Sequence, residues 1–234
     1  MPDDASAWAA SPLLPWPREV EHLEVKLDVA RRIAQRAAGG QVIGIGSGSA
    51  AFLALAAIGR RVTDEQLDLR VIPTSYETEV AASRLQLPLA RLGQVNPDWA
   101  VDGADEIDPG GRLLKGRGGA LFREKLLWNT SAKMVLAIDP SKHVQRLGSR
   151  FPIPIEVHPN AVELVAARLT ELGARMALVR TGTGKDGPVF TESAFVLLDA
   201  HFDEIAPGLH AVIKAMPGVL ETGLFVGYEY EIFE

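Results

Sequence analysis

Four clusters of polar side chains and glycines contain residue types that bind anions or transfer protons. They occupy residues 44–49, 74–79, 102–106 with the following 115–119, and 139–142. Each cluster comes directly after a short apolar run that predicts a β-strand. Because the carboxyl ends of parallel strands meet at one edge of a sheet, where open α/β folds bind ligands, we expect the four clusters to form one pocket.

The glycine turn at residues 44–49 joins a predicted strand to a predicted helix. Its free backbone N–H groups, its serine hydroxyls and the helix N-terminus would bind a phosphate. The turn also fits a loose dinucleotide-binding pattern that starts at Gly46, with Asp64 or Asp68 as the ribose-binding acid. A purely structural tight turn is a third interpretation, and the turn alone leaves all three open.

The second and fourth clusters have simple structural interpretations. Residues 74–79 place hydroxyl groups at the start of a predicted helix, where such groups commonly cap the free N–H groups. Lys142 lies on a turn after a strand and by itself is typical of a surface lysine. The five histidines show no ligand spacing, and we assign them no role.

The acidic cluster at residues 102–106 is followed by the cationic, glycine-rich stretch 115–119. Acids beside flexible glycines and a lysine suit proton transfer to and from substrate oxygens, with cations balancing a developing oxyanion. The alternatives are a solvated acidic loop, which is the simpler interpretation of the cluster alone, and a hard-metal site. The calcium-loop spacing is not met because Ala104 stands where an acid is required. The cluster alone leaves these interpretations open for Asp102, Asp105 and Glu106.

Glu124 lies within an apolar stripe of a predicted helix over residues 119–129. The stripe also contains Ala120, Leu121, Leu127 and Trp128. A carboxylate buried there would be a stronger base, as proton abstraction requires. The alternative is an edge carboxylate that reaches solvent, since Phe122 and Leu126 form a second apolar patch. We expect the buried, functional arrangement.

Predicted strands and helices alternate along the first part of the chain. Strands are expected at 41–46, 69–72, 98–101 and 133–138, and helices at 19–38, 49–58, 77–85 and 119–129. This order predicts an α/β fold with a Rossmann-like, mainly parallel sheet. Prolines at 151–154 break the pattern, and helices at 161–172 and 208–215 with strands at 175–179 and 195–198 predict a second, smaller α+β domain.

The expected domains are therefore a Rossmann-like catalytic domain over residues 19–150 and 219–234, and the small α+β domain over residues 151–218. Residues 218–225 are expected to return the chain to the first domain. Residues 1–18 are expected to form an irregular N-terminal extension.

Composition excludes several classes of protein. The 234 residues contain no cysteine, so neither disulfides nor a thiolate zinc site can form. The net charge of -6 argues against a general affinity for nucleic acid. There is no apolar run of membrane-spanning length, and no basic residue precedes Arg18 as a signal peptide would require. We expect a cytoplasmic protein that binds neither nucleic acid nor membranes.

Order and spacing connect the clusters to a known family. The shared pattern comprises Gly46-Ser47-Gly48-Ser49, Thr74-Ser75 with Thr78-Glu79, Asp102-Gly103-Ala104-Asp105-Glu106, Lys115-Gly116-Arg117-Gly118-Gly119-Ala120, Arg123-Glu124-Lys125, Asp139 with Ser141-Lys142, and Pro217-Gly218-Val219 with Gly223-Leu224-Phe225. With this pattern the chain resembles the A-type ribose-5-phosphate isomerases over nearly all of residues 19–225. The resemblance implies interconversion of ribose 5-phosphate and ribulose 5-phosphate through a cis-enediolate, in the non-oxidative pentose phosphate pathway. It also implies a sugar phosphate as the ligand, no metal or other cofactor, and a homodimer or homotetramer.

The resemblance also implies roles for single residues. Glu124 is the general base, Asp102 and Asp105 handle hydroxyl protons and ring opening, and Lys115 and Lys142 stabilise negative charge. The group that binds the substrate and its phosphate comprises Lys26, Gly46, Ser47, Gly48, Ser49, Gly116, Arg117 and Gly118.

The chain departs from the family pattern at two places. Ala50 stands where the family commonly has Thr, which removes one possible phosphate donor. Residues 191–195, Thr-Glu-Ser-Ala-Phe, replace a more usual Thr-Asp-x-Gly-Asn. The second departure is expected to affect a loop of the small domain, or assembly, more than the chemistry.

Two other functions compete with the isomerase. A dinucleotide-dependent oxidoreductase rests only on the turn at residues 46–51 and leaves the acidic cluster and Glu124 unexplained. A noncatalytic sugar-phosphate sensor would need a DNA-binding part, and no helix-turn-helix or basic segment is visible.

Overall fold

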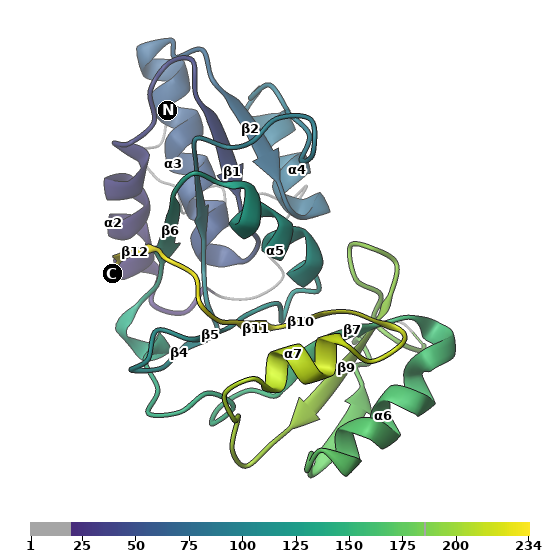
Figure 1. Ribbon diagram of the computed structural model, residues 1–234. Helices are drawn as coiled ribbons and strands as arrows, with labels where there is room; N and C mark the ends of the chain where they lie inside the picture. The colour runs from purple at the N-terminus through teal and green to yellow at the C-terminus, as the bar shows by residue number, and fades with distance from the viewer. Residues whose placement is uncertain (1–19, 185) are drawn as a thin grey trace. The chain divides into compact units, whose positions relative to one another are not determined.

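The chain folds into two compact units, and the computed structural model describes residues 20–184 and 186–234 (Figure 1). The first unit comprises the described residues up to Gly103 with Leu126–Pro140 and Glu229–Glu234. The second comprises Ala104–Lys125 and Ser141–Tyr228. The predicted N-terminal extension, residues 1–18, lies outside the described residues.

The first unit is built on a five-stranded sheet in which every pairing is parallel, with strand order β12-β6-β3-β1-β2. Its strands are β1 (Val42–Ile45), β2 (Arg70–Pro73), β3 (Trp99–Asp102), β6 (Met134–Ala137) and β12 (Glu231–Phe233). The three central strands are buried along their whole length, as a parallel sheet covered on both faces requires. The predicted Rossmann-like sheet is thereby confirmed.

Helices pack on both faces of this sheet (Figure 1). They are α2 (Leu23–Ala34), α3 (Ser49–Glu65), α4 (Tyr76–Arg84) and the end of α5 (Leu121–Thr130). Ile43 and Ile45 of β1 share a core with apolar residues of α2, α3 and α4. Gly44 points to the opposite face because side chains alternate along a strand, and a Cβ there would lie 2.5 Å from Leu127 on α5. The missing side chain lets α5 approach the sheet closely.

The second unit is an α+β structure with two antiparallel sheets, of order β10-β7-β9-β8 and β11-β5-β4. The strands are β4 (Glu106–Ile107), β5 (Leu113–Leu114), β7 (Ile153–Val157), β8 (Met176–Val179), β9 (Val196–His201), β10 (Val219–Thr222) and β11 (Leu224–Phe225). Helices α6 (Val162–Glu171) and α7 (Leu209–Lys214) accompany them, with 3-10 turns η1 (Pro140–Lys142) and η2 (Pro159–Ala161). The core includes Ile155, Leu169 and Ile213.

Strand β7 was not predicted, because Pro152 and Pro154 suggest a break rather than a central strand. The strand nevertheless pairs with both β9 and β10, and the carbonyl of Pro154 accepts a hydrogen bond from Gly223 N at 2.7 Å. A proline lacks only the N–H donor, so its carbonyl still serves the sheet.

The boundaries of the two units differ from those of the predicted domains. Residues 218–225 do not return to the first unit, because β10 pairs with β7 and β11 pairs with β5. The return comes later, at Glu229–Glu234, where β12 joins the parallel sheet beside β6. The same pairings draw residues 104–125 and 141–150 into the second unit.

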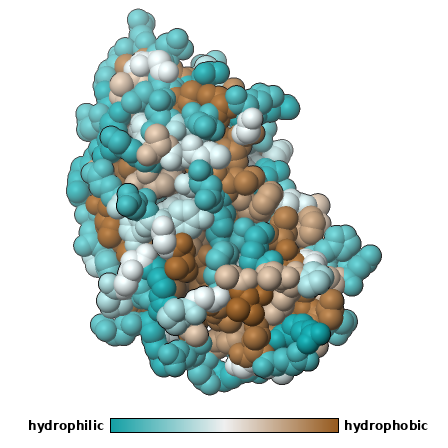
Figure 2. All heavy atoms as spheres, in the orientation of Figure 1, coloured by the Kyte–Doolittle hydropathy of each residue, from teal (hydrophilic) through white to brown (hydrophobic). Residues whose placement is uncertain are grey.

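Within the part of the chain that the structure describes, no helix combines the length and apolar character needed to cross a membrane. The second unit does expose apolar side chains, and Figure 2 shows some of them over α6 and α7. Leu164 on α6 and Val212 on α7 are each about half exposed, and both line a groove with Leu172 and Met216.

Candidate active site

Asp102 closes β3 at the carboxyl edge of the parallel sheet and is fully buried. Its Oδ2 accepts a hydrogen bond from Trp128 Nε1 at 2.9 Å, and its Oδ1 accepts one from Gly103 N at 2.8 Å. Gly46 follows β1 at the same edge, and a Cβ there would lie 2.1 Å from Asp102 Oδ1. The carboxylate and the glycine turn are therefore in direct contact, and a side chain at position 46 would collide with Asp102.

The glycine turn ends where α3 begins. Gly48 occupies the N-cap position with φ 88°, a left-handed conformation that favours glycine, and Ser47 and Ser49 flank it. The first turn of α3 carries no acidic side chain. A helix start of this kind presents backbone N–H groups and the positive end of the helix dipole to an anion.

Lys26 on α2 has its ammonium buried beside Asp139, which follows β6 at the same edge of the sheet. The Nζ atom lies 3.6 Å from Asp139 Oδ2 and donates to the carbonyl of Glu21 at 2.7 Å. Since β1, β3 and β6 are parallel neighbours, their carboxyl ends bring Gly46, Asp102 and Asp139 to one edge. The first unit thus gathers the predicted phosphate-binding residues.

In the second unit, Glu124 is buried in the first turn of α5, with an exposed fraction of 2%. The other residues of the apolar stripe are also buried: Ala120, Leu121, Leu127 and Trp128. Leu126, on the alternative patch, is exposed, and Phe122 is only partly buried. The predicted inward face of this helix is confirmed.

Lys115 is the partner of Glu124. It directly follows β5, is 3% exposed, and its Nζ lies 3.2 Å from Glu124 Oε2. The backbone N–H of Lys115 donates to the carbonyl of Gly223 at 2.9 Å, which ties the lysine to the segment before β11. A buried carboxylate in contact with a buried ammonium is an arrangement that can accept a proton and stabilise the resulting negative charge on a substrate.

Asp105 belongs to the same electrostatic group. Burial raises the pKa of Asp105 above its usual value, although the charges of Arg117, Lys115 and Lys142 act in the opposite direction. Arg117 Nη1 lies 3.6 Å from Asp105 Oδ1. A carboxyl group with a raised pKa can both donate and accept a proton closer to neutral pH. The second unit thus collects the five predicted residues Asp105, Lys115, Arg117, Glu124 and Lys142.

The loop that holds Arg117 has a defined shape. Gly116 has φ 88°, and a Cβ there would lie 2.5 Å from Cβ of Leu121, so the loop packs closely on α5. The guanidinium of Arg117 lies 4.0 Å from the centre of the Phe151 ring. The backbone carbonyl of Arg117 accepts a hydrogen bond from the Arg180 side chain. Gly118 is exposed at the tip.

Some polar residues of the sequence clusters have structural roles. Ser75 and Thr78 form a capping box at the start of α4, which confirms the capping interpretation. Glu106, which the sequence grouped with the proton-transferring acids, is fully buried. Its carboxylate accepts hydrogen bonds from the backbone N–H groups of Gly148, Arg150 and Phe151, at 2.6, 2.7 and 2.9 Å. Its acceptors hold a loop together, so we assign Glu106 no part in the proton chemistry.

The departure at residues 191–195 lies next to the glycine loop. Glu192 N donates to the carbonyl of Gly119 at 3.0 Å, and Arg123, the neighbour of Glu124, donates to the carbonyl of Glu192 at 2.8 Å. Arg123 also pairs with the Glu192 carboxylate. These contacts support residues 119–124. The expectation that the departure affects a loop or assembly more than the chemistry stays a prediction. Sequence spacing carried no signal for the contacts because Arg123 and Glu192 are 69 positions apart.

Ala194 in this segment has φ 62°, where the family pattern has glycine. A side chain in the left-handed region costs about 1 to 2 kcal/mol, partly offset by the greater freedom of glycine in the unfolded chain. We therefore expect Ala194→Gly to stabilise the fold by about 0.5 to 1 kcal/mol, or ~1 to 4 °C in Tm for a chain of this size. Thermal unfolding measures the change, with Ala177→Gly on β8 as a control that should lower Tm. A Tm of Ala194→Gly below that of the unmodified chain would contradict the argument.

The comparisons with known proteins bear on this geometry. The family model described as ribose 5-phosphate isomerase A (phosphoriboisomerase A) matches residues 70–233. The ribose-5-phosphate isomerase A of Thermosynechococcus vestitus is 41% identical over 207 residues, which cover 87% of each chain. The chain belongs to the ribose 5-phosphate isomerase A family.

Solved structures of this family have the same fold. The ribose 5-phosphate isomerase A of Methanocaldococcus jannaschii superposes with a TM-score of 0.86 at 36% identity, covering 91% of this chain and 95% of its own. A D-ribose-5-phosphate isomerase in complex with phospho-erythronic acid superposes with a TM-score of 0.85 at 34% identity, covering 90% of this chain and 94% of its own. Membership of the family makes this chain an enzyme of the isomerase class.

Proposed function

We propose that this enzyme interconverts D-ribose 5-phosphate and D-ribulose 5-phosphate through a cis-enediolate, as a step of the non-oxidative pentose phosphate pathway. The observation that carries the proposal is the buried pair of Glu124 and Lys115, 3.2 Å apart, with Asp105 in the same electrostatic group. Moving a proton between two carbons requires a base that is held close and dry, with a cation for the developing oxyanion.

In the proposed mechanism, Asp102 and Asp105 exchange protons with the sugar hydroxyls and open the ring. Glu124 then takes the proton from C2 of the open-chain aldose, and the electron pair of that C–H bond forms the C1–C2 double bond of the enediolate. Lys115 and Lys142 stabilise the negative oxygen. Glu124 returns its proton to C1, and the O2 proton is transferred to O1 by the groups that exchange protons with the sugar oxygens. This leaves a hydroxyl at C1 and the ketone at C2, so atoms and charges balance.

The phosphate of the substrate is assigned to the glycine turn and its neighbours. Ser47 and Ser49 supply hydroxyls, α3 supplies the N–H groups of its first turn, and the buried ammonium of Lys26 supplies charge. The loop of Gly116, Arg117 and Gly118 is assigned to the rest of the sugar. No residue of this assignment requires a metal ion. Across residues 20–184 and 186–234, no group of three or more His, Asp and Glu is arranged to hold one.

The relative solved with phospho-erythronic acid supports the choice of intermediate. That compound carries a phosphate and a planar carboxylate, whose two oxygens and negative charge resemble those of an enediolate. A stable analogue of a reaction intermediate binds more tightly than the substrate. We expect phospho-erythronic acid to inhibit this enzyme competitively.

The direct test is incubation with ribose 5-phosphate and detection of ribulose 5-phosphate, with and without an excess of EDTA. The proposed chemistry uses only side chains, so we expect turnover to persist unchanged under exhaustive chelation. Loss of activity in EDTA that magnesium or manganese restores would assign the acids to a metal site. Failure to form ribulose 5-phosphate in either condition would contradict the proposed function itself.

Ala50, in the first turn of α3, tests the phosphate site. Ala50→Thr adds a hydroxyl beside the proposed phosphate, and one charge-assisted hydrogen bond contributes about 1.5 to 3 kcal/mol before steric adjustment. Because the phosphate stays ionised and distant from the reacting carbons, the added bond should lower KM several-fold and leave kcat unchanged. Inhibition by inorganic phosphate should strengthen in parallel. If phosphate inhibition is unchanged in both Ala50→Thr and Ser49→Ala, the glycine turn does not bind the phosphate.

We propose a homodimer or homotetramer as the working form. Supporting this proposal, β8 is an edge strand of its sheet, and its Met176, Leu178 and Val179 are exposed. Apolar side chains along an open strand edge are a surface that natural proteins usually cover. Light scattering on the purified enzyme distinguishes the dimer and tetramer from a monomer.

A further inference from the structure

Lys125 follows the proposed base Glu124 on α5, and its ammonium is buried. Its Nζ donates to the carbonyls of Thr222 and Leu224, both at 2.8 Å, and to Glu221 Oε1 at 3.0 Å. An ammonium has three N–H donors, so these three acceptors occupy all of them in one geometry. Lys125 therefore fastens the first turn of α5 to residues 221–224.

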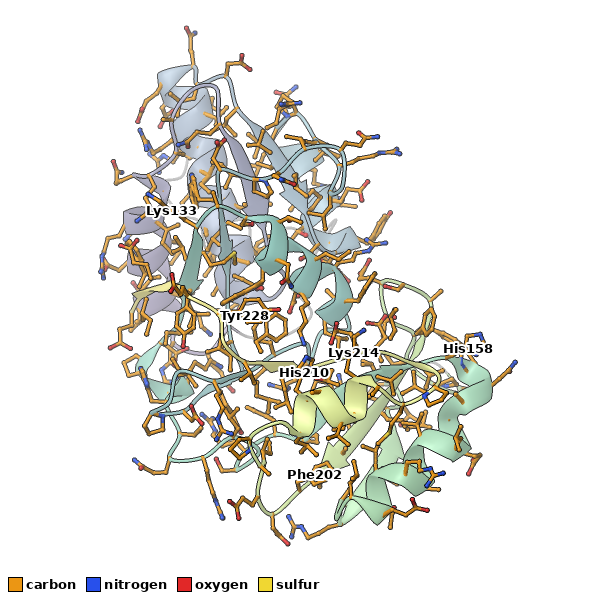
Figure 3. All side chains as sticks on the ribbon, in the orientation of Figure 1. Lys133, His158, Phe202, His210, Lys214 and Tyr228 are labelled. Atoms are coloured by element: carbon orange, nitrogen blue, oxygen red, sulfur yellow. The ribbon has the colours of Figure 1, made fainter. Side chains whose placement is uncertain are left out.

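The carboxylate of Glu221 also has several partners. It is buried on β10, its Oε1 also accepts from Thr222 N at 2.9 Å, and its Oε2 lies 3.4 Å from Lys214 Nζ on α7. Figure 3 shows Lys214 and His210 on the side of α7 that is next to β10. Burial acts to raise the pKa of Glu221, but Lys125 and the hydrogen bonds bring that pKa below its usual value. Glu221 is therefore a carboxylate at neutral pH.

The segment that anchors Lys125 also anchors Lys115. The carbonyl of Gly223 accepts from Lys115 N, and β11 pairs with β5 directly before Lys115. Both ammonium groups lie near the ring of Phe225, whose centre is 5.3 Å from Lys115 Nζ and 4.6 Å from Lys125 Nζ. Residues 221–225 thus connect the helix turn that carries Glu124 with the strand end that carries Lys115.

From these contacts we propose that the buried Lys125–Glu221 pair is a positioning device that sets the Glu124 carboxylate against Lys115 and the reacting carbons. The inference rests on the proposed function of Glu124 as the base. A buried ion pair often stabilises a fold no more than an apolar pair of the same volume would. A contribution to stability alone therefore does not explain the presence of the Lys125–Glu221 pair. Proton abstraction from carbon, in contrast, depends steeply on geometry, and a misplacement of about 1 Å can cost ~100-fold in rate.

The titration of Lys125 predicts that kcat depends on pH. Burial lowers the pKa of Lys125 to about 8, while Glu221 and Glu124 act to raise it and Lys214 to lower it further. His210 lies near the same group, hydrogen-bonded to Thr222 Oγ1 at 2.8 Å, and burial and then Lys125 lower its pKa. As the pH rises through about 8, Lys125 loses its charge and one donor, and the anchor weakens. We expect kcat to fall over this range without a matching change in KM.

The test compares Lys125→Met with the double variant Lys125→Met, Glu221→Gln. The single variant leaves a buried carboxylate without its main partner and is expected to unfold more easily, whereas the double variant removes both charges and should regain most of the stability. We expect kcat in the double variant to stay about 10-fold to 100-fold below that of the unmodified enzyme, because the geometric anchor is gone. Its KM should change less than about threefold, since the phosphate contacts are untouched. The kcat decline near pH 8 should be absent.

The matched control is Arg112→Met, Asp108→Asn, which removes another ion pair of the second unit, with an N–O distance of 2.7 Å. Neither residue has a part in the proposed chemistry, so kcat is expected to stay within about twofold. A double variant at 125 and 221 that recovers both Tm and kcat would overturn the positioning role and leave the pair purely structural.

The same series separates this inference from the function on which it rests. If the unmodified enzyme forms no ribulose 5-phosphate, the proposed function fails. If the unmodified enzyme is active and the double variant matches it at every pH, only the positioning role fails. A crystal structure of the double variant gives a readout independent of turnover: we expect the Glu124–Lys115 distance to depart from 3.2 Å, and an unchanged distance counts against the proposal.

Discussion

Glu124→Gln is expected to lower kcat about 100-fold to 10,000-fold, the usual cost of removing a general base. The amide keeps the shape of the side chain but cannot take a proton from carbon. Asp105 remains in the same electrostatic group as Lys115, so the lysine keeps an acidic neighbour and the fold should survive. KM should change far less than kcat, because the phosphate and hydroxyl contacts do not involve Glu124.

Two further measurements and a control variant test this prediction. Exchange of the C2 proton of ribose 5-phosphate with D2O should fall in step with kcat, because both require abstraction of that proton. Binding of phospho-erythronic acid should persist. Glu163→Gln is the matched control, since Glu163 occupies the first turn of α6 as Glu124 occupies that of α5, but is exposed. If Glu124→Gln keeps near-normal kcat and proton exchange, the base lies elsewhere.

Gly46→Ala is expected to lower kcat by about 100-fold or more, although the change adds a single methyl group. The new Cβ would lie 2.1 Å from Oδ1 and 2.3 Å from Cγ of Asp102, so the carboxylate must move. Moving it strains or breaks its hydrogen bonds from Trp128 and Gly103. Because Asp102 is assigned to ring opening, its displacement should lower the kcat measured with ribose 5-phosphate.

Gly103→Ala is the comparison, since a Cβ there meets its nearest atoms at 3.6 and 3.7 Å, in ordinary contact. It keeps the N–H that donates to Asp102, and we expect it to lower kcat by less than about threefold. Thermal unfolding of both variants shows whether lost activity reflects lost structure. A Gly46→Ala enzyme with unchanged kcat would show that the position of Asp102 does not matter to the reaction.

Local patterns in the sequence were sufficient for several features. Burial of Glu124 follows from the spacing of Ala120, Leu121, Leu127 and Trp128, because a helix brings residues three and four apart onto one face. The shared edge of Gly46, Asp102 and Asp139 follows from the alternation of strands and helices, because a parallel sheet aligns its carboxyl ends. The capping by Ser75 is equally local, since its partner Thr78 is three residues away.

Tertiary structure decided the features that depend on residues far apart in the chain. The anchoring of Lys125 by Glu221 joins residues 96 positions apart, and the pairing of β11 with β5 brings the segment after Glu221 to the strand end that carries Lys115. No periodicity encodes such a pairing, because each of the two strands is only two residues long. For the same reason Glu106 could be assigned only from its hydrogen bonds to residues 148–151: a carboxylate looks the same in sequence whether its acceptors meet a substrate or a backbone loop.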